Sequence, residues 1–288
     1  MNFFVIGCNG MAGHLISLYL YEQDHDVMGY ARSCLRLVPS ETGDVRDVER
    51  IKAIVAEGHF DTIINCVGLL NQFAESDKAS AVFLNAYFPH FLADITAGTD
   101  TQVIHMSTDC VFSGKRGEYT EHDLRDGETF YDRSKALGEL EDEKNLTLRN
   151  SIVGPDIKES GIGLLNWFMK NTVKADSLVN GYTKAVWSGQ TTLQLAKTME
   201  AAARERVHGL YNMVSAQSIT KYELLQLFNK YLRSGQVLVN PVEGINADKS
   251  LKRTNFDFSY EIPDYETMVA EMAIWIKEHK ALYPHYAL

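Results

Sequence analysis

The strongest constraint on the fold of this chain is the regular alternation of short apolar runs with longer amphipathic segments through its first half. The runs that we expect as strands are Phe3–Ile6, Asp26–Tyr30, Asp61–Cys66, Thr101–Met106 and Leu146–Asn150. The segments that we expect as helices are Gly10–Tyr21, Val48–Glu57, Ala79–Ala97 and one that starts near Tyr131. Nearly continuous apolar strands are typical of a parallel sheet covered on both faces. The alternation therefore predicts an α/β fold with a doubly wound parallel sheet and right-handed crossovers.

The second half of the chain is less regular and predicts a smaller lobe. Its expected helices are Gly161–Lys174, Thr191–Arg206, Lys221–Arg233 and Tyr265–Lys280, and its expected strand is Gly209–Met213. No stretch resembles a flexible interdomain linker. We therefore expect a sheet domain over residues 1–150 and a C-terminal lobe over residues 151–288, packed together around a cleft. Some segments of the second half are expected to return to the sheet domain.

Charge and cysteine content restrict the partners and the location. The 288 residues carry a formal net charge of -10, which argues against nucleic acid and anionic membranes as partners but still permits a small anionic ligand beside local Lys and Arg residues. We expect no secretory leader, since no long apolar stretch stands in the first residues, and no apolar run approaches the roughly 20 residues of a membrane span. The cysteines Cys8, Cys34, Cys66 and Cys110 have no zinc-like spacing. We therefore expect free thiols, no metal site and a cytoplasmic protein.

Three glycines follow the first expected strand and open the first expected helix. Gly7, Gly10 and Gly13 have the spacing G-x-x-G-x-x-G, with Asn9 and Met11 between them. Glycines at such a junction permit a tight turn, close approach of the backbone to a pyrophosphate, and close packing of helix on strand. The N–H groups of the helix N-terminus favour an anion. The turn predicts a dinucleotide site, although many strand–helix turns need glycine for structural reasons alone.

The end of the second expected strand indicates which dinucleotide binds. A site for NAD usually has Asp or Glu there, to bind the ribose 2′-hydroxyl, whereas this chain has Arg32 and Ser33. A guanidinium and a hydroxyl suit the 2′-phosphate of NADP instead. We therefore expect NADPH as the cofactor. The alternative is that Arg32 is a solvated surface residue.

A tyrosine and a lysine with helical spacing are the main catalytic candidates. Tyr131 and Lys135 share one face of the expected helix. An ammonium beside a phenol lowers the pKa of the tyrosine, which makes it a usable proton donor to a carbonyl. A Tyr-x-x-x-Lys match also occurs by chance, but here Ser107-Thr108-Asp109 follows the fourth expected strand, where an open α/β sheet binds its ligands. We expect a hydroxyl of this segment to bind the substrate carbonyl opposite Tyr131.

Two further groups belong to the same expected edge of the sheet. Cys66-Val67-Gly68 ends the third expected strand and is expected to line the cofactor. Asn85, on the following helix, is expected in the cofactor site and as a residue that holds this region together through hydrogen bonds.

These features together resemble the extended short-chain dehydrogenase/reductase superfamily and, within it, the dTDP-4-dehydrorhamnose reductase-like group. The segments that carry the resemblance are Gly7–Gly13, Asp44-Val45, Asn65–Gly68, Asn85, His105–Gly114, Tyr131–Lys135, Leu148–Gly154 and Gly209–Asn212. The resemblance implies a Rossmann domain, a C-terminal substrate-binding lobe and NADPH-dependent reduction of a nucleotide sugar at its 4-keto group. It implies that Thr108, Tyr131 and Lys135 form a catalytic triad, the last two also against the cofactor. Asp44 and Val45 would lie against the adenine.

The chain departs from that group in three places. Cys110 stands where the family usually has a tyrosine that faces the substrate, and Asp132 follows Tyr131 where glycine is common. Residues 180–189 keep only the outline of the family pattern. An N-acetylated 4-keto-6-deoxyhexose on UDP therefore fits as well as the dTDP-linked precursor of rhamnose. Either sugar would serve surface polysaccharide biosynthesis.

A nucleotide-sugar diphosphate needs local cations in so acidic a protein. Lys249, Lys252 and Arg253 lie in one short segment, in a region where the resembled family contributes an arginine to its substrate; the alternative is a solvated basic patch. Trp187 is a candidate for stacking near the base or sugar, or a core tryptophan. The expected substrate-facing residues are Ser107, Asp109, Cys110, Trp187, Lys249 and Arg253.

Two other functions stay open. Sugar-nucleotide epimerases and dehydratases hold NAD, but this chain lacks the acidic residue after the second strand, and dehydratases tend to have Asp-Glu where it has Asp109-Cys110. The superfamily also includes a non-catalytic regulatory subunit of methionine adenosyltransferase, but the intact Thr108, Tyr131 and Lys135 favour an enzyme. The expected partner is a nucleotide sugar, and a homodimer stays open.

Overall fold

A seven-stranded parallel sheet forms the centre of the fold in the computed structural model, which describes residues 1–33 and 37–288. The strands are β1 (Asn2–Ile6), β2 (Asp26–Ala31), β3 (Ser40–Thr42), β4 (Thr62–Asn65), β5 (Gln102–Met106), β6 (Leu146–Arg149) and β11 (Gly209–Asn212). Their order is β11-β6-β5-β4-β1-β2-β3, and every neighbouring pair is parallel. On one side of the sheet the strands follow the chain order from β1 to β3, and on the other side they follow it from β4 through β5 and β6 to β11. This confirms the expected doubly wound sheet.

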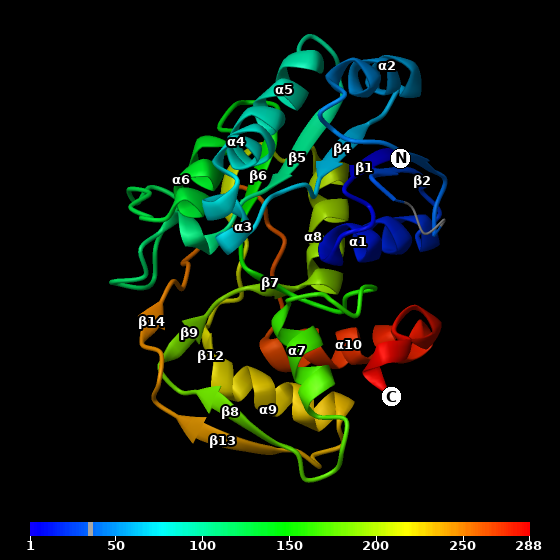
Figure 1. Cartoon of the computed structure of the whole chain (residues 1–288). Helices are drawn as coiled ribbons and strands as arrows, with labels where there is room; N and C mark the ends of the chain where they lie inside the picture. The colour runs from blue at the N-terminus through cyan, green and yellow to red at the C-terminus, as the bar shows by residue number, and fades with distance from the viewer. Residues whose placement is uncertain (34–36) are drawn as a thin grey trace.

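Helices cover both faces of the sheet (Figure 1). On one face, α2 (Val48–Gly58) and α5 (Phe88–Ile95) share a buried cluster with Phe4 and Ile63 of the strands. On the other face, α1 (Met11–Glu22) packs against α8 (Thr192–Glu205). Strands buried on both faces are largely apolar, which explains the apolar runs in their sequence, although buried polar residues such as Thr62, Gln102 and Thr147 interrupt these runs. None of the helices in the described parts of the chain has the length and apolarity that crossing a membrane requires.

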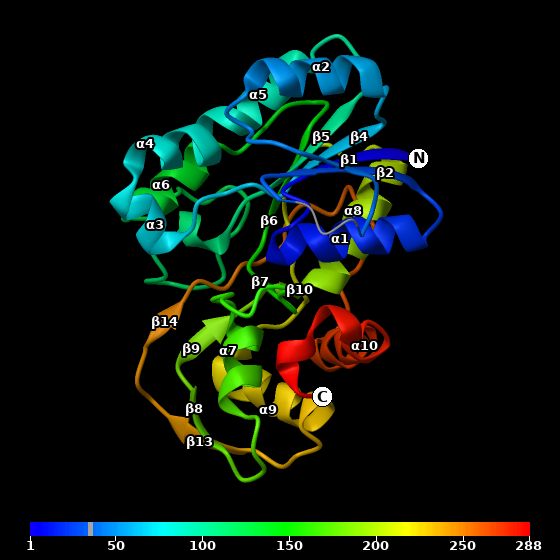
Figure 2. The same cartoon turned by 45° about the vertical axis from the view of Figure 1, so that its right-hand side comes forward.

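The second lobe contains three helices and three short sheets (Figure 2). The helices are α7 (Leu164–Asn171), α9 (Lys221–Leu232) and α10 (Tyr265–Glu278). The paired strands are β7 (Ile152–Val153) with β10 (Gln190–Thr191), β8 (Leu178–Tyr182) with β13 (Leu238–Val242), and β9 (Ala185–Trp187) with β12 (Ile219–Thr220) and β14 (Ala247–Asp248). Each of these strands has only two to five residues, too few for a periodic pattern to reveal them.

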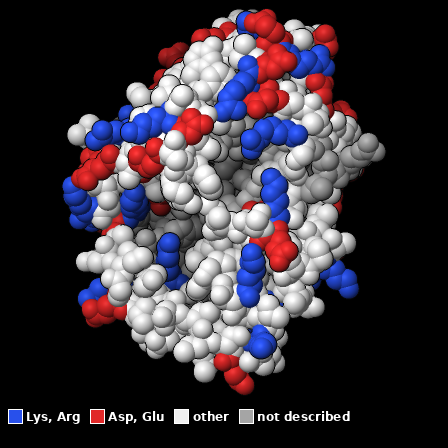
Figure 3. Space-filling model, viewed as in Figure 1, with Lys and Arg blue, Asp and Glu red and all other residues white. Residues whose placement is uncertain are grey.

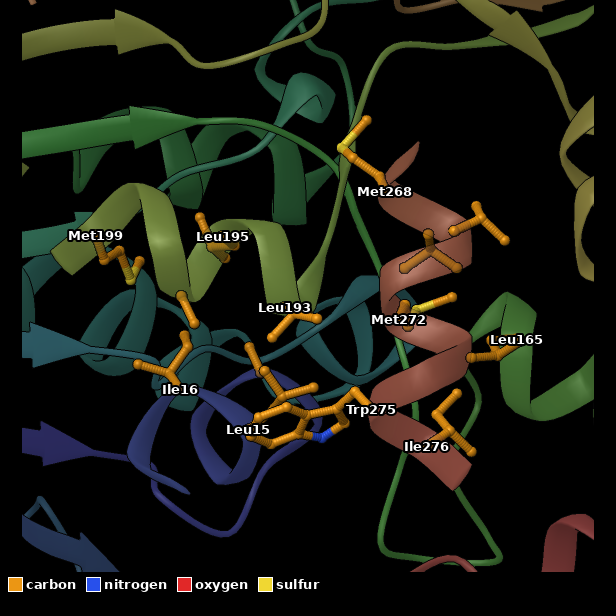
Figure 4. Packing of buried hydrophobic residues seen from close by; sticks show 14 of the residues in the cluster. Leu15, Ile16, Leu165, Leu193, Leu195, Met199, Met268, Met272, Trp275 and Ile276 are labelled. Carbon is orange, nitrogen blue, oxygen red and sulfur yellow. The ribbon is translucent and has the colours of Figure 1, made fainter. Parts of the chain in front are cut away.

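One buried cluster runs through both lobes (Figure 4). Leu15 and Ile16 of α1 and Met199 of α8 belong to it, together with Met272 and Trp275 of α10. In addition, α8 and β11 return from the second half of the chain to cover and extend the main sheet. The two lobes therefore share a core, and the expected boundary near residue 150 stays a prediction.

The helix expected over Ala79–Ala97 is interrupted. α4 (Lys78–Ala81) is followed by a π-helical turn at Val82–Tyr87 and only then by α5. Pro89 has no N–H for the carbonyl of Asn85, four residues earlier, and its ring displaces that carbonyl from the α-helical position. The short elements that the sequence pattern did not predict are β3 and α3 (Asn71–Ser76).

Candidate active site

A cavity of about 440 Å³ lies at the carboxyl ends of β1, β2 and β4. The expected cofactor residues that line it are Gly7, Asn9, Gly10, Arg32, Ser33, Asp44, Val45, Cys66, Val67 and Gly68. The lining residues that sequence reasoning missed are Tyr30, Ala31, Gly43, Arg46, Leu69, Phe73, Ser76, Asp77, Ser80, Leu84 and Lys158. Figure 3 shows a hollow in this face of the molecule with lysine and arginine side chains around it. The cavity and its cations suit an anionic ligand.

The backbone of the glycine turn lines one side of the cavity. Gly7 has a φ of 89°, in the left-handed region, and its N–H donates to the Tyr30 carbonyl at 2.7 Å. A Cβ on Gly13 would lie 2.1 Å from the Gly7 carbonyl oxygen, so glycine is needed for α1 to approach β1 this closely. Gly13 therefore serves packing, and neither Gly13 nor Met11 lines the cavity. Since α1 begins without a side-chain cap, its first N–H groups are available to a phosphate.

The tip of β2 presents a cation and a hydroxyl to the cavity. Arg32 and Ser33 are exposed there, and Asn9 Nδ2 donates to Ser33 Oγ at 2.9 Å. The other amide atom, Asn9 Oδ1, is buried and has no hydrogen-bond partner among the described residues. An acceptor buried beside a cavity usually has a donor when the site is occupied. The glycine turn and the strand tip thus form one polar wall.

A second guanidinium, which sequence reasoning missed, borders the cavity. Arg46 Nη2 donates to Ser80 Oγ at 2.7 Å, and Nη1 donates to the Asp44 carboxylate at 3.3 Å. Asp44 also accepts the backbone N–H of Arg46 at 2.9 Å. These bonds fix the loop of Asp44 and Val45, which the resemblance places against the adenine. The available signal was a cation directly after these two residues.

Thr108 and Tyr131 meet beside the cavity. Thr108 follows β5 and caps a 3-10 turn at Asp109–Val111. The Thr108 hydroxyl donates to Asp109 Oδ1 at 3.1 Å and lies near enough to the Tyr131 phenol to lower its pKa. Tyr131 lies in the first turn of α6 (Phe130–Leu137) and packs with Leu69, which lines the cavity. The structure therefore brings the expected hydroxyl and the expected proton donor together.

Asp132 has a local role that explains one departure from the resembled family. Its carboxylate accepts the Thr129 N–H at 3.2 Å, and Thr129 Oγ1 accepts the Asp132 N–H at 3.1 Å. This reciprocal pair is a capping box at the start of α6. The substitution for glycine therefore stabilises the helix that presents Tyr131 and Lys135.

Lys135 lies one turn after Tyr131, and its ammonium contacts Met106 and His105 of β5. Its Nζ donates to the Met106 carbonyl at 2.6 Å and lies 3.3 Å from His105 Nε2. Burial lowers the pKa of Lys135 to about 8. Burial also raises the pKa of Tyr131 above its ordinary value, and the nearby Thr108 side chain offsets only part of this. The expected lowering of the Tyr131 pKa is therefore wrong for this arrangement, because desolvation of the phenol dominates.

Asn85 positions the site without lining it. Its buried Oδ1 accepts the Leu69 N–H at 2.7 Å, and Nδ2 donates to the Leu69 carbonyl at 2.9 Å and to Ser134 Oγ at 3.0 Å. The amide thus joins the loop after β4 to α6, as expected. Asn85 is buried and does not line the cavity, so its expected contact with the cofactor stays a prediction.

Asp109, Cys110 and Lys249 form a group next to Tyr131. Burial raises the pKa of the Asp109 carboxyl, against the attraction of Lys249 and Lys221. Burial raises the pKa of the Cys110 thiol to about 12. The Lys249 stem passes close to Gly114, where a Cβ would lie 2.8 Å from Lys249 Cγ. The partly exposed Lys249 of the second lobe therefore lies near the segment of Asp109 and Cys110.

Two residues that we assigned to the substrate have other partners. Ser107 Oγ donates to the Glu139 carboxylate at 2.5 Å, because successive residues of an extended strand end point to opposite faces and Ser107 points away from Thr108. Trp187 is 7% exposed and packs against Tyr265, with 5.6 Å between ring centroids. Both assignments are corrected: Ser107 anchors the strand end, and Trp187 belongs to the core.

Arg253 is a third correction. Its Nε donates to the Asn255 carbonyl at 2.8 Å, Nη1 donates to the Tyr260 carbonyl at 2.6 Å, and Nη2 donates to the Phe258 carbonyl. The guanidinium also lies over the Tyr211 and Phe258 rings. These contacts engage Arg253 in fixing its own loop, in place of the expected diphosphate contact. Lys249 remains the candidate cation of this segment.

The thiols agree with the sequence where the structure describes them. Cys66 and Cys110 are not in disulfides, and Cys34 lies outside the described residues. No group of three or more His, Cys, Asp or Glu side chains within the described ranges is arranged to hold a metal ion.

Comparisons with known proteins agree with this geometry. The chain is 28% identical to the probable low-salt glycan biosynthesis reductase Agl14 of Haloferax volcanii over 227 residues, 75% of each chain. It is 25% identical to the dTDP-4-keto-6-deoxy-D-glucose reductase of Streptomyces niveus, over 83% of this chain and 81% of that one. A dTDP-4-dehydrorhamnose reductase from Bacillus anthracis, solved in complex with NADP, has the same fold, with a TM-score of 0.79, 18% identity, and coverage of 96% of this chain and 100% of that one. The RmlD substrate binding domain model matches residues 1–256. The resemblance drawn from the sequence is thereby confirmed, and the chain belongs to the RmlD substrate binding domain family.

Proposed function

We propose that this chain uses NADPH to reduce the 4-keto group of a nucleotide-activated 4-keto-6-deoxysugar. The main support is that the Thr108 and Tyr131 side chains lie close together, with Lys135 one helical turn after Tyr131. These residues lie beside the cavity that Arg32 and Ser33 line. A hydroxyl, a phenol and a lysine next to a dinucleotide cavity suit carbonyl reduction. The named activities of the reductase relatives and the NADP complex of the similar fold support the same chemistry.

The residues of the cavity fit NADPH. The free N–H groups at the start of α1 and the backbone turn at Gly7 would bind the pyrophosphate. Arg32 and Ser33 would bind the 2′-phosphate, with Arg46 at the same end. The unpartnered Asn9 Oδ1 would accept a hydrogen bond from the cofactor. Bound NADPH would supply the hydride.

The proton would come from Tyr131. Burial keeps its phenol protonated, since its pKa is raised, and a protonated phenol is the form that can donate to the carbonyl oxygen. Thr108 would orient that oxygen through its hydroxyl. Lys135 would leave the Met106 carbonyl and stabilise the tyrosinate that remains. General acids of this kind contribute roughly 10²–10⁴-fold to rates.

The sugar nucleotide would enter from the second lobe. Lys249 lies beside Asp109 and Cys110, next to the catalytic tyrosine, and would offset the charge of the diphosphate. The small Cys110 side chain leaves room that a tyrosine would fill. We therefore propose a dTDP- or UDP-linked sugar, the latter N-acetylated, that serves surface polysaccharide biosynthesis. Reduced Cys66 and Cys110 thiols fit action in the cytoplasm.

The test is incubation of the purified chain with NADPH and a panel of dTDP- and UDP-linked 4-keto-6-deoxysugars, followed by NMR of the products. We expect NADPH to be consumed in step with a new C4 hydroxyl. Conversion without net NADPH consumption would favour an epimerase or a dehydratase. Tight NADPH binding without turnover of any sugar would favour a regulatory subunit. Light scattering of the same sample tests for a homodimer.

A further inference from the structure

A buried histidine that the proposed mechanism does not use lies next to Lys135. His105 in β5 is fully buried, with Nε2 3.3 Å from Lys135 Nζ and Nδ1 3.2 Å from Asn65 Nδ2. Lys135 Nζ also donates to the Met106 carbonyl at 2.6 Å. The other titratable groups that act on this pair are Cys66 and Glu139 on Lys135 and His90 on His105.

The orientation of the Asn65 amide fixes the direction of these hydrogen bonds. Asn65 Oδ1 accepts the backbone N–H of Val67 at 3.1 Å, so the oxygen is committed and Nδ2 faces His105. An amide nitrogen only donates, and His105 Nδ1 must therefore accept. A neutral imidazole with an accepting Nδ1 carries its proton on Nε2. The His105 N–H therefore points at Lys135.

A ring N–H at this position distinguishes between the two protonation states of Lys135. A neutral amine can donate to Met106 and accept from His105 through its lone pair, whereas an ammonium has only donors and is repelled by the N–H. Burial acts in the same direction, because it lowers the pKa of Lys135 to about 8 and holds the pKa of His105 well below its usual value. Glu139 and Cys66 oppose these effects by favouring the ammonium.

We propose that Asn65 locks His105 in the tautomer protonated on Nε2, and that His105 thereby acts as a positioning residue that weakens proton binding by Lys135 in the free enzyme. Cofactor binding would then draw Lys135 away from His105, and Lys135 would take up a proton from the solvent. This coupling rests on the proposed function, whereas the tautomer does not.

The first experiment is a long-range ¹H–¹⁵N correlation spectrum of the free protein labelled in its histidines, at neutral pH. His14 is an internal reference of the opposite kind, since its Nδ1 lies 3.0 Å from the Gly10 carbonyl, which can only accept, and its Nε2 lies 3.0 Å from the Tyr283 hydroxyl. We expect His14 protonated on Nδ1 and His105 on Nε2, with His14→Gln and His105→Gln assigning the signals. A His105 ring protonated on Nδ1, or on both nitrogens, overturns the proposal.

The second experiment changes the hydrogen-bond partner that sets the His105 tautomer. Asn65→Asp keeps the size of the side chain and the acceptor for Val67 but removes the donor, so His105 Nδ1 must donate and Nε2 must accept from Lys135. We expect the tautomer to invert and the ¹³Cε titration midpoint of Lys135 to rise by about one pH unit or more. Asn171 is exposed at the end of α7. Asn171→Asp adds the same charge there and should change neither the His105 tautomer nor the Lys135 midpoint. An unchanged tautomer in Asn65→Asp would contradict the role of Asn65 in setting the His105 tautomer. If this variant does not fold, the wild-type spectrum decides alone.

The third experiment measures proton uptake when NADP⁺ binds, by calorimetry slightly above pH 8 in buffers of different ionisation enthalpy. We expect uptake by the wild type and reduced uptake by Asn65→Asp, whose lysine is already protonated. Equal uptake by both proteins contradicts the coupling. Lack of turnover with every sugar nucleotide would contradict the proposed function and leave the tautomer untouched.

Discussion

The Glu139 carboxylate and the Arg149 guanidinium form a fully buried ion pair, with 2.7 Å between Oε2 and Nη2. The same carboxylate accepts a hydrogen bond from the hydroxyl of Ser107, the residue directly before Thr108. Arg125 pairs with the outer edge of the carboxylate. The ion pair therefore anchors the strand end that carries the Thr108 hydroxyl.

Glu139→Gln should destabilise the fold strongly. The amide has the same size but leaves the Arg149 guanidinium buried without a counter-charge, which typically costs about 3–5 kcal/mol. Urea unfolding measures the loss. Glu141→Gln is the matched control, because Glu141 is 54% exposed and pairs with Arg125 at the surface; its effect should stay within about 0.5 kcal/mol. Equal stability of the two variants would remove the anchoring role of Glu139.

Tyr131→Phe should lose turnover and keep NADPH binding. The substitution removes only the phenolic hydroxyl, and loss of a general acid costs roughly 10²–10⁴-fold. Loss of reduced-nicotinamide absorbance measures turnover, and fluorescence titration measures binding. Tyr21→Phe, at a tyrosine that is 48% exposed on α1, should leave both unchanged. Retention of more than about a tenth of the wild-type rate would exclude Tyr131 as the acid.

Arg32→Asp should shift the cofactor preference from NADPH towards NADH. A carboxylate at the tip of β2 repels the 2′-phosphate and accepts a hydrogen bond from a ribose 2′-hydroxyl. The readout is the ratio of kcat/KM for the two cofactors. Arg204→Asp makes the same charge change on α8, away from the cavity, and serves as the control. An unchanged ratio in Arg32→Asp would remove Arg32 from the site.

Lys249→Ala should raise the KM for the sugar nucleotide several-fold and leave NADPH affinity unchanged. Lys249 acts on Asp109 and Cys110, so its ammonium would contact the diphosphate of one ligand only. Lys252→Ala, at an exposed neighbour in the same segment, is the control. Arg253→Ala should instead lower stability, since its guanidinium holds three carbonyls of its loop. A KM within twofold of wild type for Lys249→Ala would contradict the assignment.

The sequence predicts the sheet and its ligand-binding edge because these depend on local pattern. Phe3–Ile6 is fully buried, so its unbroken apolarity follows from burial on both faces. Gly7 and Gly13 are required by backbone geometry at a single turn. Parallel strands then bring Val67 and Thr108, which follow β4 and β5, to the same edge.

Side-chain direction and long-range pairing could not be read from the sequence. Ser107 and Thr108 are adjacent, yet one anchors to Glu139 and the other contacts Tyr131. Trp187 is in the core because its ring packs against Tyr265 of α10, a contact between distant segments. Arg253 looks like an anion ligand in sequence, but its partners are carbonyls presented by a loop whose shape depends on tertiary packing.

The last prediction concerns the effect of pH on stability. His14 in α1 is fully buried and lies between the Gly10 carbonyl and the Tyr283 hydroxyl near the C-terminus. Burial lowers the pKa of His14 to about 4 from 6.5. Between these values the unfolded chain binds a proton that the folded chain does not. The stability that neutral His14 contributes is therefore complete above about pH 6.5 and is lost as the pH falls towards 4, by at most about 1.4 kcal/mol per pH unit.

Urea unfolding of the wild type, His14→Gln and His208→Gln at pH 7, 6 and 5 tests this prediction. Carboxylates also titrate in acid, but they do so alike in all three proteins, so the difference in slope isolates the histidine. His14→Gln should be less stable than the wild type at pH 7, because the buried contact with Tyr283 is altered, and should lose less stability on acidification, because no imidazole has to be protonated. His208 is exposed and its substitution should leave the slope unchanged. A slope for His14→Gln equal to that of the wild type would contradict the lowered pKa of His14 in the folded protein.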